Sequence, residues 1–231
     1  MRRQVKKRRI FYGKMTELYI HDVYLLLKRT SGRSWRFRPL IVQNAFTLSC
    51  PRYTRDRDAY LFAKERIEEK IKNGVYNDFG NGGYIRLFGE KIPVMVYSGT
   101  RDSVTENMGI IYLERKTAEM TYSFRNAVYR FYVKKLTEKL KERVPIMQNY
   151  VGLQCAGWAV SSVYSVWGKC NLKTKKIVFS AELAAQSVAF IDQVIVHELA
   201  HLVFPNHGKE FHEFMAKYVP DYKDLMKKVW K

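Results

Sequence analysis

The chain has 231 residues and a formal net charge of +19 at pH 7. Its 47% hydrophobic and 14% aromatic content excludes a disordered protein and favours a globular one with a substantial core. No apolar run reaches the ~18 residues that a membrane span needs, and no apolar segment follows the basic N-terminus as in a secretory signal. Cys50, Cys155 and Cys170 form no CxxC pair, so neither a disulfide framework nor a cysteine zinc site is predicted. We therefore expect a cytoplasmic protein.

Basic residues are concentrated at the N-terminus. Six lysines and arginines lie between Arg2 and Arg9, and a mobile basic arm is predicted over residues 1–16. Without these six charges the net charge is still +13, so the folded part is itself basic. This charge fits attraction to a nucleic acid or a nucleotide, and it fits a solvated basic surface equally well.

The first half of the chain, over residues 17–115, is predicted to be rich in strands. One helix is expected there, from Thr54 or Asp56 to Asn73, because apolar residues recur at helical spacing and Asn73-Gly74 would end it. Strands are expected at residues 18–27, 39–42, 45–49, 84–88, 92–97 and 108–113.

The second half, over residues 116–231, has mainly helical patterns. Residues 118–143 have apolar positions near helical spacing, and Pro145 is expected to lie beyond the end of this helix. A hairpin or small sheet is expected to follow, over residues 151–166 and 176–180. A short helical turn and two further helices complete the prediction, at residues 181–186, 190–204 and 208–218.

The most informative stretch is His197-Glu198-Leu199-Ala200-His201, which lies in the first of these two helices. Residues i and i+4 of a helix lie nearly one above the other, so both imidazoles would occupy one face. Pro205 and Asn206 would end the helix and let His207 fold back as a third ligand. Glu198 would lie beside the site as a general base. The spacing predicts a catalytic zinc site with one open coordination position.

Several other residues are candidates for a place near this site. His212 lies five residues after His207, so a position behind the ligands or on the surface is favoured over ligation. Tyr164, Trp167 and Tyr218 would stabilise charge on a substrate if they face it, although packing in the core is favoured for each.

The order of motifs in the second half resembles the YgjP-like metal-dependent hydrolases, which are related to the WLM and SprT-like zinc proteases. The resemblance is carried by four segments and is sharp from about Ser165 onward, with a looser match over the preceding residues from 17. These segments are Trp167-Gly168-Lys169-Cys170, Ile177-Val178-Phe179-Ser180, Val196–His201 and Asn206–Phe211.

The resemblance implies an α+β fold with a zincin-like, minimal gluzincin catalytic domain behind a β-rich N-terminal half. It implies zinc ligation by His197, His201 and His207, with Glu198 as the general base. The family usually has an arginine before the Trp-Gly pair, whereas this chain has Val166. If that arginine binds substrate in relatives, this protein must bind its substrate differently.

These observations predict a zinc-dependent hydrolase, first of all a metallopeptidase. Two alternatives stay open. One is a nucleoside triphosphate pyrophosphohydrolase that uses the same site, and the other is a basic nucleic-acid-binding protein with a structural zinc. The substrate is thus a peptide or a nucleotide, with nucleic acid as a further partner.

Overall fold

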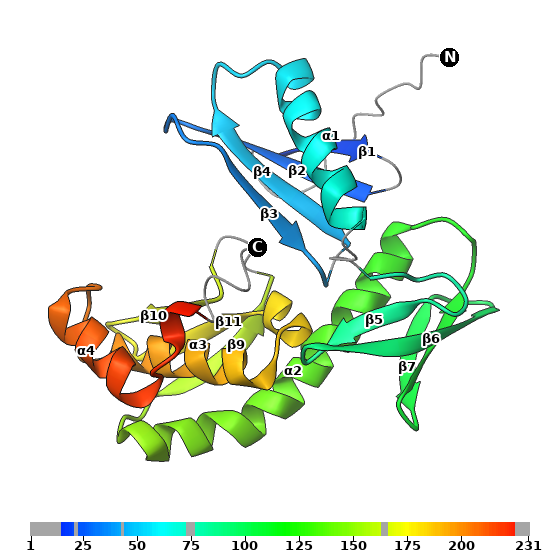
Figure 1. The fold of residues 1–231 in the computed structure, drawn as a ribbon. Coiled ribbons are helices and arrows are strands. Elements are labelled where there is room, and N and C mark those ends of the chain that lie inside the picture. Colours follow the sequence, from blue (N-terminus) through cyan, green and yellow to red (C-terminus); the bar gives the residue numbers. More distant parts are fainter. Residues whose placement is uncertain (1–14, 21–22, 43, 73–76, 163–165, 225–231) are drawn as a thin grey trace.

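The computed structural model describes residues 15–20, 23–42, 44–72, 77–162 and 166–224. Most of the predicted basic arm over residues 1–16 lies outside this part of the chain, as does Tyr164. Within it the fold is a mixed α+β arrangement with three small sheets (Figure 1).

The first sheet consists of β1 (Met15–Ile20), β2 (Val23–Thr30), β3 (Arg36–Leu40) and β4 (Ala45–Pro51), in the order β1-β2-β4-β3. The strand predicted over residues 18–27 is divided into β1 and β2, which pair with each other in antiparallel register. Helix α1 (Asp56–Lys72) packs against this sheet, and together they enclose a small hydrophobic cluster of their own. Strand β3 forms one edge of the sheet.

The second sheet has the order β5-β6-β8-β7. Its strands are β5 (Tyr84–Leu87), β6 (Glu90–Ser98), β7 (Ser103–Asn107) and β8 (Ile110–Arg115). The sequence pattern did not predict β7. This strand reads Ser-Val-Thr-Glu-Asn and lies at an edge of the sheet, so it carries little of the apolar alternation that marks a strand.

The long helix α2 (Tyr122–Val151) extends further than expected and contains Pro145. A proline in a helix removes one hydrogen bond and crowds the carbonyl four residues earlier. Here that carbonyl belongs to Lys141, and both residues are exposed, so water can satisfy the freed group. The apolar face of α2 is continuous on both sides of the proline, from Phe124 to Val151, and packing of this face keeps the helix intact.

The third sheet and the last two helices make up the rest of the fold. Strands β9 (Gly157–Ser161), β10 (Gly168–Asn171) and β11 (Lys176–Ser180) have the order β10-β11-β9, so β10 is an edge strand. The pair β9–β11 is parallel, and the hairpin is formed by β10 and β11. A short 3₁₀ helix, η1 (Ala181–Ala185), leads into α3 (Val188–Ala200).

Helix α3 is the centre of the larger hydrophobic cluster. Ser187 caps its first turn by accepting a hydrogen bond from the Phe190 N–H at 3.3 Å. The helix is apolar on nearly all sides and is covered by α2, by the third sheet and by α4 (Lys209–Tyr218) (Figure 1). A helix buried in this way holds its few polar side chains in fixed positions.

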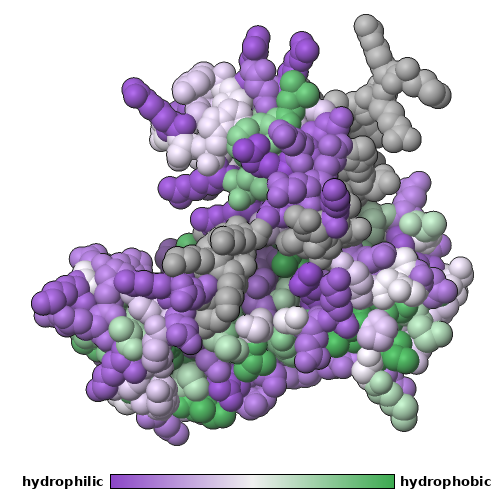
Figure 2. Space-filling model, in the orientation of Figure 1, coloured by the Kyte–Doolittle hydropathy of each residue, from purple (hydrophilic) through white to green (hydrophobic). Residues whose placement is uncertain are grey.

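The face of the molecule shown in Figure 2 is largely hydrophilic. Among the residues that the structure describes, none belongs to a helix with both the length and the apolar character required to cross a bilayer.

Candidate metal centre

Three imidazoles meet at the C-terminal end of α3. His197 lies in the last turn of α3, His201 caps its end, and His207 belongs to the loop that leads to α4. One ring nitrogen of each lies within 4.8 Å of the others, and Nε2 of His207 is 3.2 Å from Nε2 of His197. Two ligand nitrogens on a tetrahedral zinc ion are separated by roughly 3.3 Å, since each Zn–N bond is about 2.0–2.1 Å long. The His197 and His207 nitrogens therefore have the spacing of two ligands on one metal ion, and His201 offers a third ring nitrogen in the same cluster.

The hydrogen bonds around these rings favour the tautomer that binds metal. Nδ1 of His201 is 3.0 Å from the carbonyl oxygen of Phe204, to which it can donate. A proton on Nδ1 leaves Nε2 as the free ligand atom, and such a bond behind a ligand fixes the ring orientation. Burial lowers the pKa of His197 to about 3, with smaller contributions from His201, His207 and His212, so its imidazole is neutral.

A single aromatic ring supports all three imidazoles. The Phe211 ring of α4 is stacked on His201 at 5.1 Å and is met by His197 at 5.0 Å and His207 at 4.6 Å, between ring centroids. Phe211 is only 1% exposed. Helix α4 therefore sets the distances between the three rings by folding back over the end of α3.

The Glu198 carboxylate lies beside the imidazoles, on the side of β10. Glu198 is 4% exposed, and it accepts a hydrogen bond from the backbone N–H of Cys170. Burial raises the pKa of Glu198 to about 7, and the Cys170 N–H opposes this shift. A carboxyl group with such a pKa can accept and release a proton near neutral pH.

Gly168 leaves the space that Glu198 occupies. A Cβ atom at position 168 would lie 2.6 Å from Cγ and 2.6 Å from Oε1 of Glu198. These distances are shorter than any real contact, so no other residue fits without moving the glutamate. The glycine at position 168 is thus explained by the close approach of β10 to α3.

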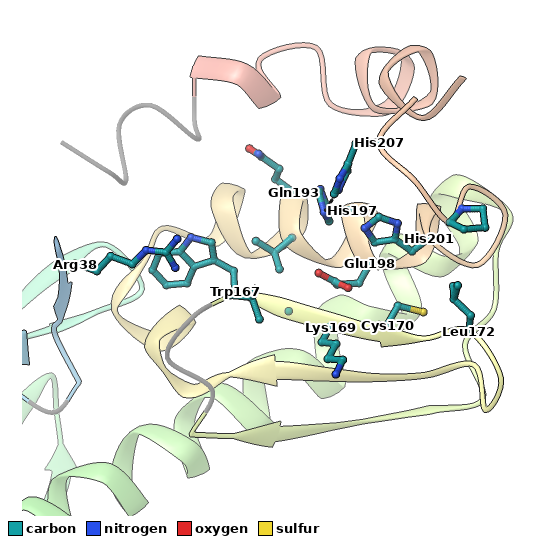
Figure 3. Close-up of a pocket in the computed structure, with 14 residues that line it drawn as sticks. Arg38, Trp167, Lys169, Cys170, Leu172, Gln193, His197, Glu198, His201 and His207 are labelled. Carbon is teal, nitrogen blue, oxygen red and sulfur yellow. Dashed lines mark hydrogen bonds between the residues drawn. The ribbon is translucent and has the colours of Figure 1, made fainter. Parts of the chain in front are cut away.

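The imidazoles and Glu198 open into one cavity of about 450 Å³, which we call the metal pocket (Figure 3). Its floor is the side of α3 that carries His197 and Glu198, and its rim is formed by β10, by the loop after α3 and by Arg38 from β3. Apart from Glu198, the charged residues that line it are Arg38 and Lys169.

The remaining candidates from the sequence occupy different places. Trp167 lines the metal pocket, and its ring meets Phe190 edge-on at 5.3 Å. His212 does not belong to the group of three imidazoles, and its Nδ1 lies 2.9 Å from the Tyr222 hydroxyl. Tyr218 packs on Phe214 and Tyr150, outside the lining of the pocket.

Sequence reasoning missed three contributors to this site. Phe211 belongs to an amphipathic helix whose position could not be known, and the Cys170 N–H is a backbone group with no sequence signal. Arg38 is 159 positions before His197, and no local pattern connects β3 with α3. Only the tertiary packing brings them together.

A buried HExxH helix with a third histidine in the following loop defines a candidate metal site of the metallopeptidase kind. The chain belongs to the YgjP-like family: its metallopeptidase-domain model matches residues 41–229, most of the sequence. No match was found among curated proteins. Among solved structures, the chain is similar to the metallopeptidase zymogen abylysin of Pyrococcus abyssi. That similarity has 16% identity and a TM-score of 0.37, and it covers 39% of this chain and 90% of the other.

Proposed function

We propose that this protein is a zinc-dependent peptidase with a zincin-like, minimal gluzincin site. The observation that carries the proposal is the meeting of three imidazoles and one buried carboxylate in an open pocket. His197, His201 and His207 would hold the zinc ion, and Glu198 would act as the general base. A bound zinc ion supplies a Lewis acid and lowers the pKa of water to roughly 7.

The protein's own residues then have defined tasks. Glu198 would accept a proton from the attacking water at its carboxylate and deliver it to the leaving amine, as a general acid–base group does. The Cys170 N–H holds that carboxylate in place, and Phe211 holds the imidazoles. The edge strand β10 borders the pocket and could pair with an extended peptide through its backbone, which would align a substrate along α3.

A structural zinc site is less well supported. Structural sites are closed by four protein ligands. Within the described residues the group of candidate ligands has three members, and these members line a cavity. Nucleic-acid binding through the basic surface stays a separate proposal.

A nucleoside triphosphate is the second candidate substrate. Arg38 and Lys169 give the pocket an excess of positive charge over the single carboxylate of Glu198, and phosphates favour such surroundings. The peptidase proposal is preferred because the matching family model describes a metallopeptidase domain.

The decisive experiment compares both reactions with one zinc-loaded preparation. Cleavage of casein and of quenched fluorescent peptides is measured beside pyrophosphate release from nucleoside triphosphates. Glu198→Gln should retain zinc and lose about 10²–10⁴-fold in turnover, because general acid–base catalysis contributes that much. Glu210→Gln, an exposed acid in the first turn of α4, is the matched control and should retain activity. Full activity in Glu198→Gln would contradict the proposal.

A further inference from the structure

Arg38 reaches the metal pocket from a sheet that contains none of the other site residues. It lies in the edge strand β3, opposite Thr47 of β4. Its neighbour Phe37 stacks on Phe46 at 5.1 Å, inside the cluster that α1 covers. Because side chains alternate along a strand, Arg38 faces the other way, and it extends toward Trp167 (Figure 3).

The position of Arg38 is fixed by its own strand. Leu40, at the end of β3, is 2% exposed, and Val42 is completely buried in the larger hydrophobic cluster. The Val42 N–H also donates a hydrogen bond of 3.0 Å to Oε2 of Glu182 in η1. The strand is therefore anchored next to the third sheet, and the Arg38 guanidinium is partly buried at the rim of the pocket.

The charges near this guanidinium favour an anionic ligand. Burial lowers the pKa of Arg38, and the neighbouring Arg36 adds to this effect. Arg38 also lines a small adjoining cavity with Glu182. Burial raises the pKa of Glu182 to about 8, which leaves that carboxyl group mainly protonated at neutral pH. A guanidinium stays charged when it is partly buried, and its planar set of donors can bind a carboxylate through two hydrogen bonds.

Arg38 and the imidazoles lie at different ends of the pocket (Figure 3). The residues of α3 that line it run from Gln193 to His201, which corresponds to roughly 12 Å of helix. Trp167, beside Arg38, meets Phe190 near the start of α3, whereas the imidazoles lie at its end. An extended peptide advances about 3.3 Å per residue, so about two to four residues separate the two ends.

We propose that Arg38 is a specificity-determining residue that binds a carboxylate of the substrate, about two to four residues from the bond that is cut. This inference rests on the proposed peptidase function. The carboxylate is either an Asp or Glu side chain or the free C-terminus of the peptide. Arg38 precedes residues 41–229, so it lies outside the part of the chain that the family model matches.

The test uses the full-length, zinc-loaded protein and quenched fluorescent peptides. In one set a single Glu is moved along an otherwise neutral sequence, with Gln at the same position as its reference. In a second set neutral peptides end in a free carboxylate or an amide. The quantity compared is the ratio of kcat/KM for the charged peptide to that for its neutral partner. If this ratio rises above one only in the first set, the ligand of Arg38 is a side-chain carboxylate. If it rises above one only in the second set, the ligand is the C-terminal carboxylate.

Arg38→Gln should lower this ratio about 10-fold or more, as expected for the loss of a hydrogen bond between charged groups. Arg36→Gln removes the same charge two residues earlier on β3, where the side chain is exposed and does not line the pocket, and should lower the ratio much less than Arg38→Gln. Binding measured without turnover provides a second readout. In the zinc-loaded Glu198→Gln background, Arg38→Gln should raise the Kd for the preferred charged peptide by a similar factor.

Two results would overturn the inference, and they are distinguishable. In the first result, the wild-type protein cleaves peptides but shows no preference for a carboxylate, or Arg38→Gln and Arg36→Gln lower the kcat/KM ratio equally. This result removes the role of Arg38 and leaves the peptidase function standing. A wild-type protein that retains zinc but cleaves none of the peptides removes the proposed function and the inference with it. Zinc content and circular dichroism confirm that each variant is folded.

Discussion

At the scale of single residues, the site depends on two close approaches that fix its geometry. Gly168 allows β10 to lie against Glu198, and Phe211 supports the three imidazoles. Neither residue carries chemistry of its own. Both act by restricting positions, and small displacements of catalytic groups cost large factors in rate.

Gly168→Ala tests the close approach of β10 to Glu198. The added Cβ would lie 2.6 Å from Oε1 of Glu198, so the carboxylate must move away from its present position. We expect turnover to fall by about 10²-fold, as misplacement of a catalytic group does, with zinc content retained. Steady-state kinetics and metal analysis provide the measurement. The control is Gly32→Ala, where a Cβ would meet only Thr30 Oγ1 at 3.8 Å, and an equal loss there would refute the explanation.

Phe211→Leu tests the support that Phe211 gives to the three imidazoles. The leucine keeps an apolar side chain in the core but removes the ring that contacts His197, His201 and His207. Zinc affinity should fall roughly 10–100-fold, the usual effect of losing support behind metal ligands. Competition with a chelator measures this. Phe214→Leu, in the same helix but packed on Phe204 and Tyr218, should change the affinity much less.

The sequence allowed part of this site to be predicted. The i, i+4 spacing of His197 and His201 and the helix stop before His207 pointed to a three-histidine group, and the structure brings these rings together. The contribution of Phe211 depends on the angle between α3 and α4, which no local pattern encodes. The roles of Glu198 and the three ligands remain predictions until the variants are measured.

At the scale of elements, α3 is held in place at its start and near its middle. The β5–β6 turn meets the residues just before α3, where the Phe88 N–H donates to the Ala184 carbonyl of η1 at 2.7 Å. Gly89 in that turn has φ +90°, and a Cβ there would lie 3.0 Å from Cα of the capping residue Ser187. Further along, Arg143 of α2 forms two hydrogen bonds to Asp192, of 2.8 and 2.6 Å.

The Arg143–Asp192 pair should contribute measurably to stability. Both side chains are about four-fifths buried, with relative exposures of 21% and 20%, so the pair is shielded from solvent. Arg143→Gln should lower the free energy of unfolding by roughly 1–3 kcal/mol, since it leaves Asp192 without its charged donor. Urea denaturation measures this. The reference is Lys64→Gln, which breaks an exposed pair with Glu68 on α1 and should cost less than about 0.5 kcal/mol.

Helices were easier to predict than strands in this chain. Apolar periodicity indicated α1, α2, α3 and α4, and Gly152, with φ 71°, ends α2 where no stop was expected. The prediction that α2 ends before Pro145 was wrong. Proline disfavours a helix interior, but packing of the apolar face of α2 outweighs this effect. Strands β7 and β10 were missed because they are short edge strands whose pairing partners, not their own residues, make them strands.

At the scale of the whole molecule, the first sheet and the site region meet where Val42 enters the larger core. Glu182 is the buried acid at this junction, and it accepts hydrogen bonds from the backbone of Val42 and Ile41. The division of the chain into an arm and two regions with a boundary near residue 115 stays a prediction. The contact through Val42 shows that residues on either side of that boundary share one hydrophobic cluster.

This junction predicts a pH dependence of stability. Burial raises the pKa of Glu182 from 4.5 to about 8, so the folded state keeps a proton that the unfolded state releases. The stability from this group is complete below pH 4.5 and declines as the pH rises toward 8, by at most about 1.4 kcal/mol per pH unit. Glu182→Gln cannot ionise, so the difference in unfolding free energy between variant and wild type should grow over this range. A constant difference from pH 5 to pH 8.5 would argue against a buried, protonated Glu182.

The separation in sequence between Arg38 and the imidazoles also affects the order in which the protein folds during its synthesis. Strands β1 to β4 pair among residues 15–51 and can form early on the ribosome, whereas the pocket needs Phe211 of α4 as well. Contacts between distant segments form late because loop closure opposes them. A nascent chain would thus carry Arg38 in a paired strand long before His207 and Phe211 are available to complete the metal pocket.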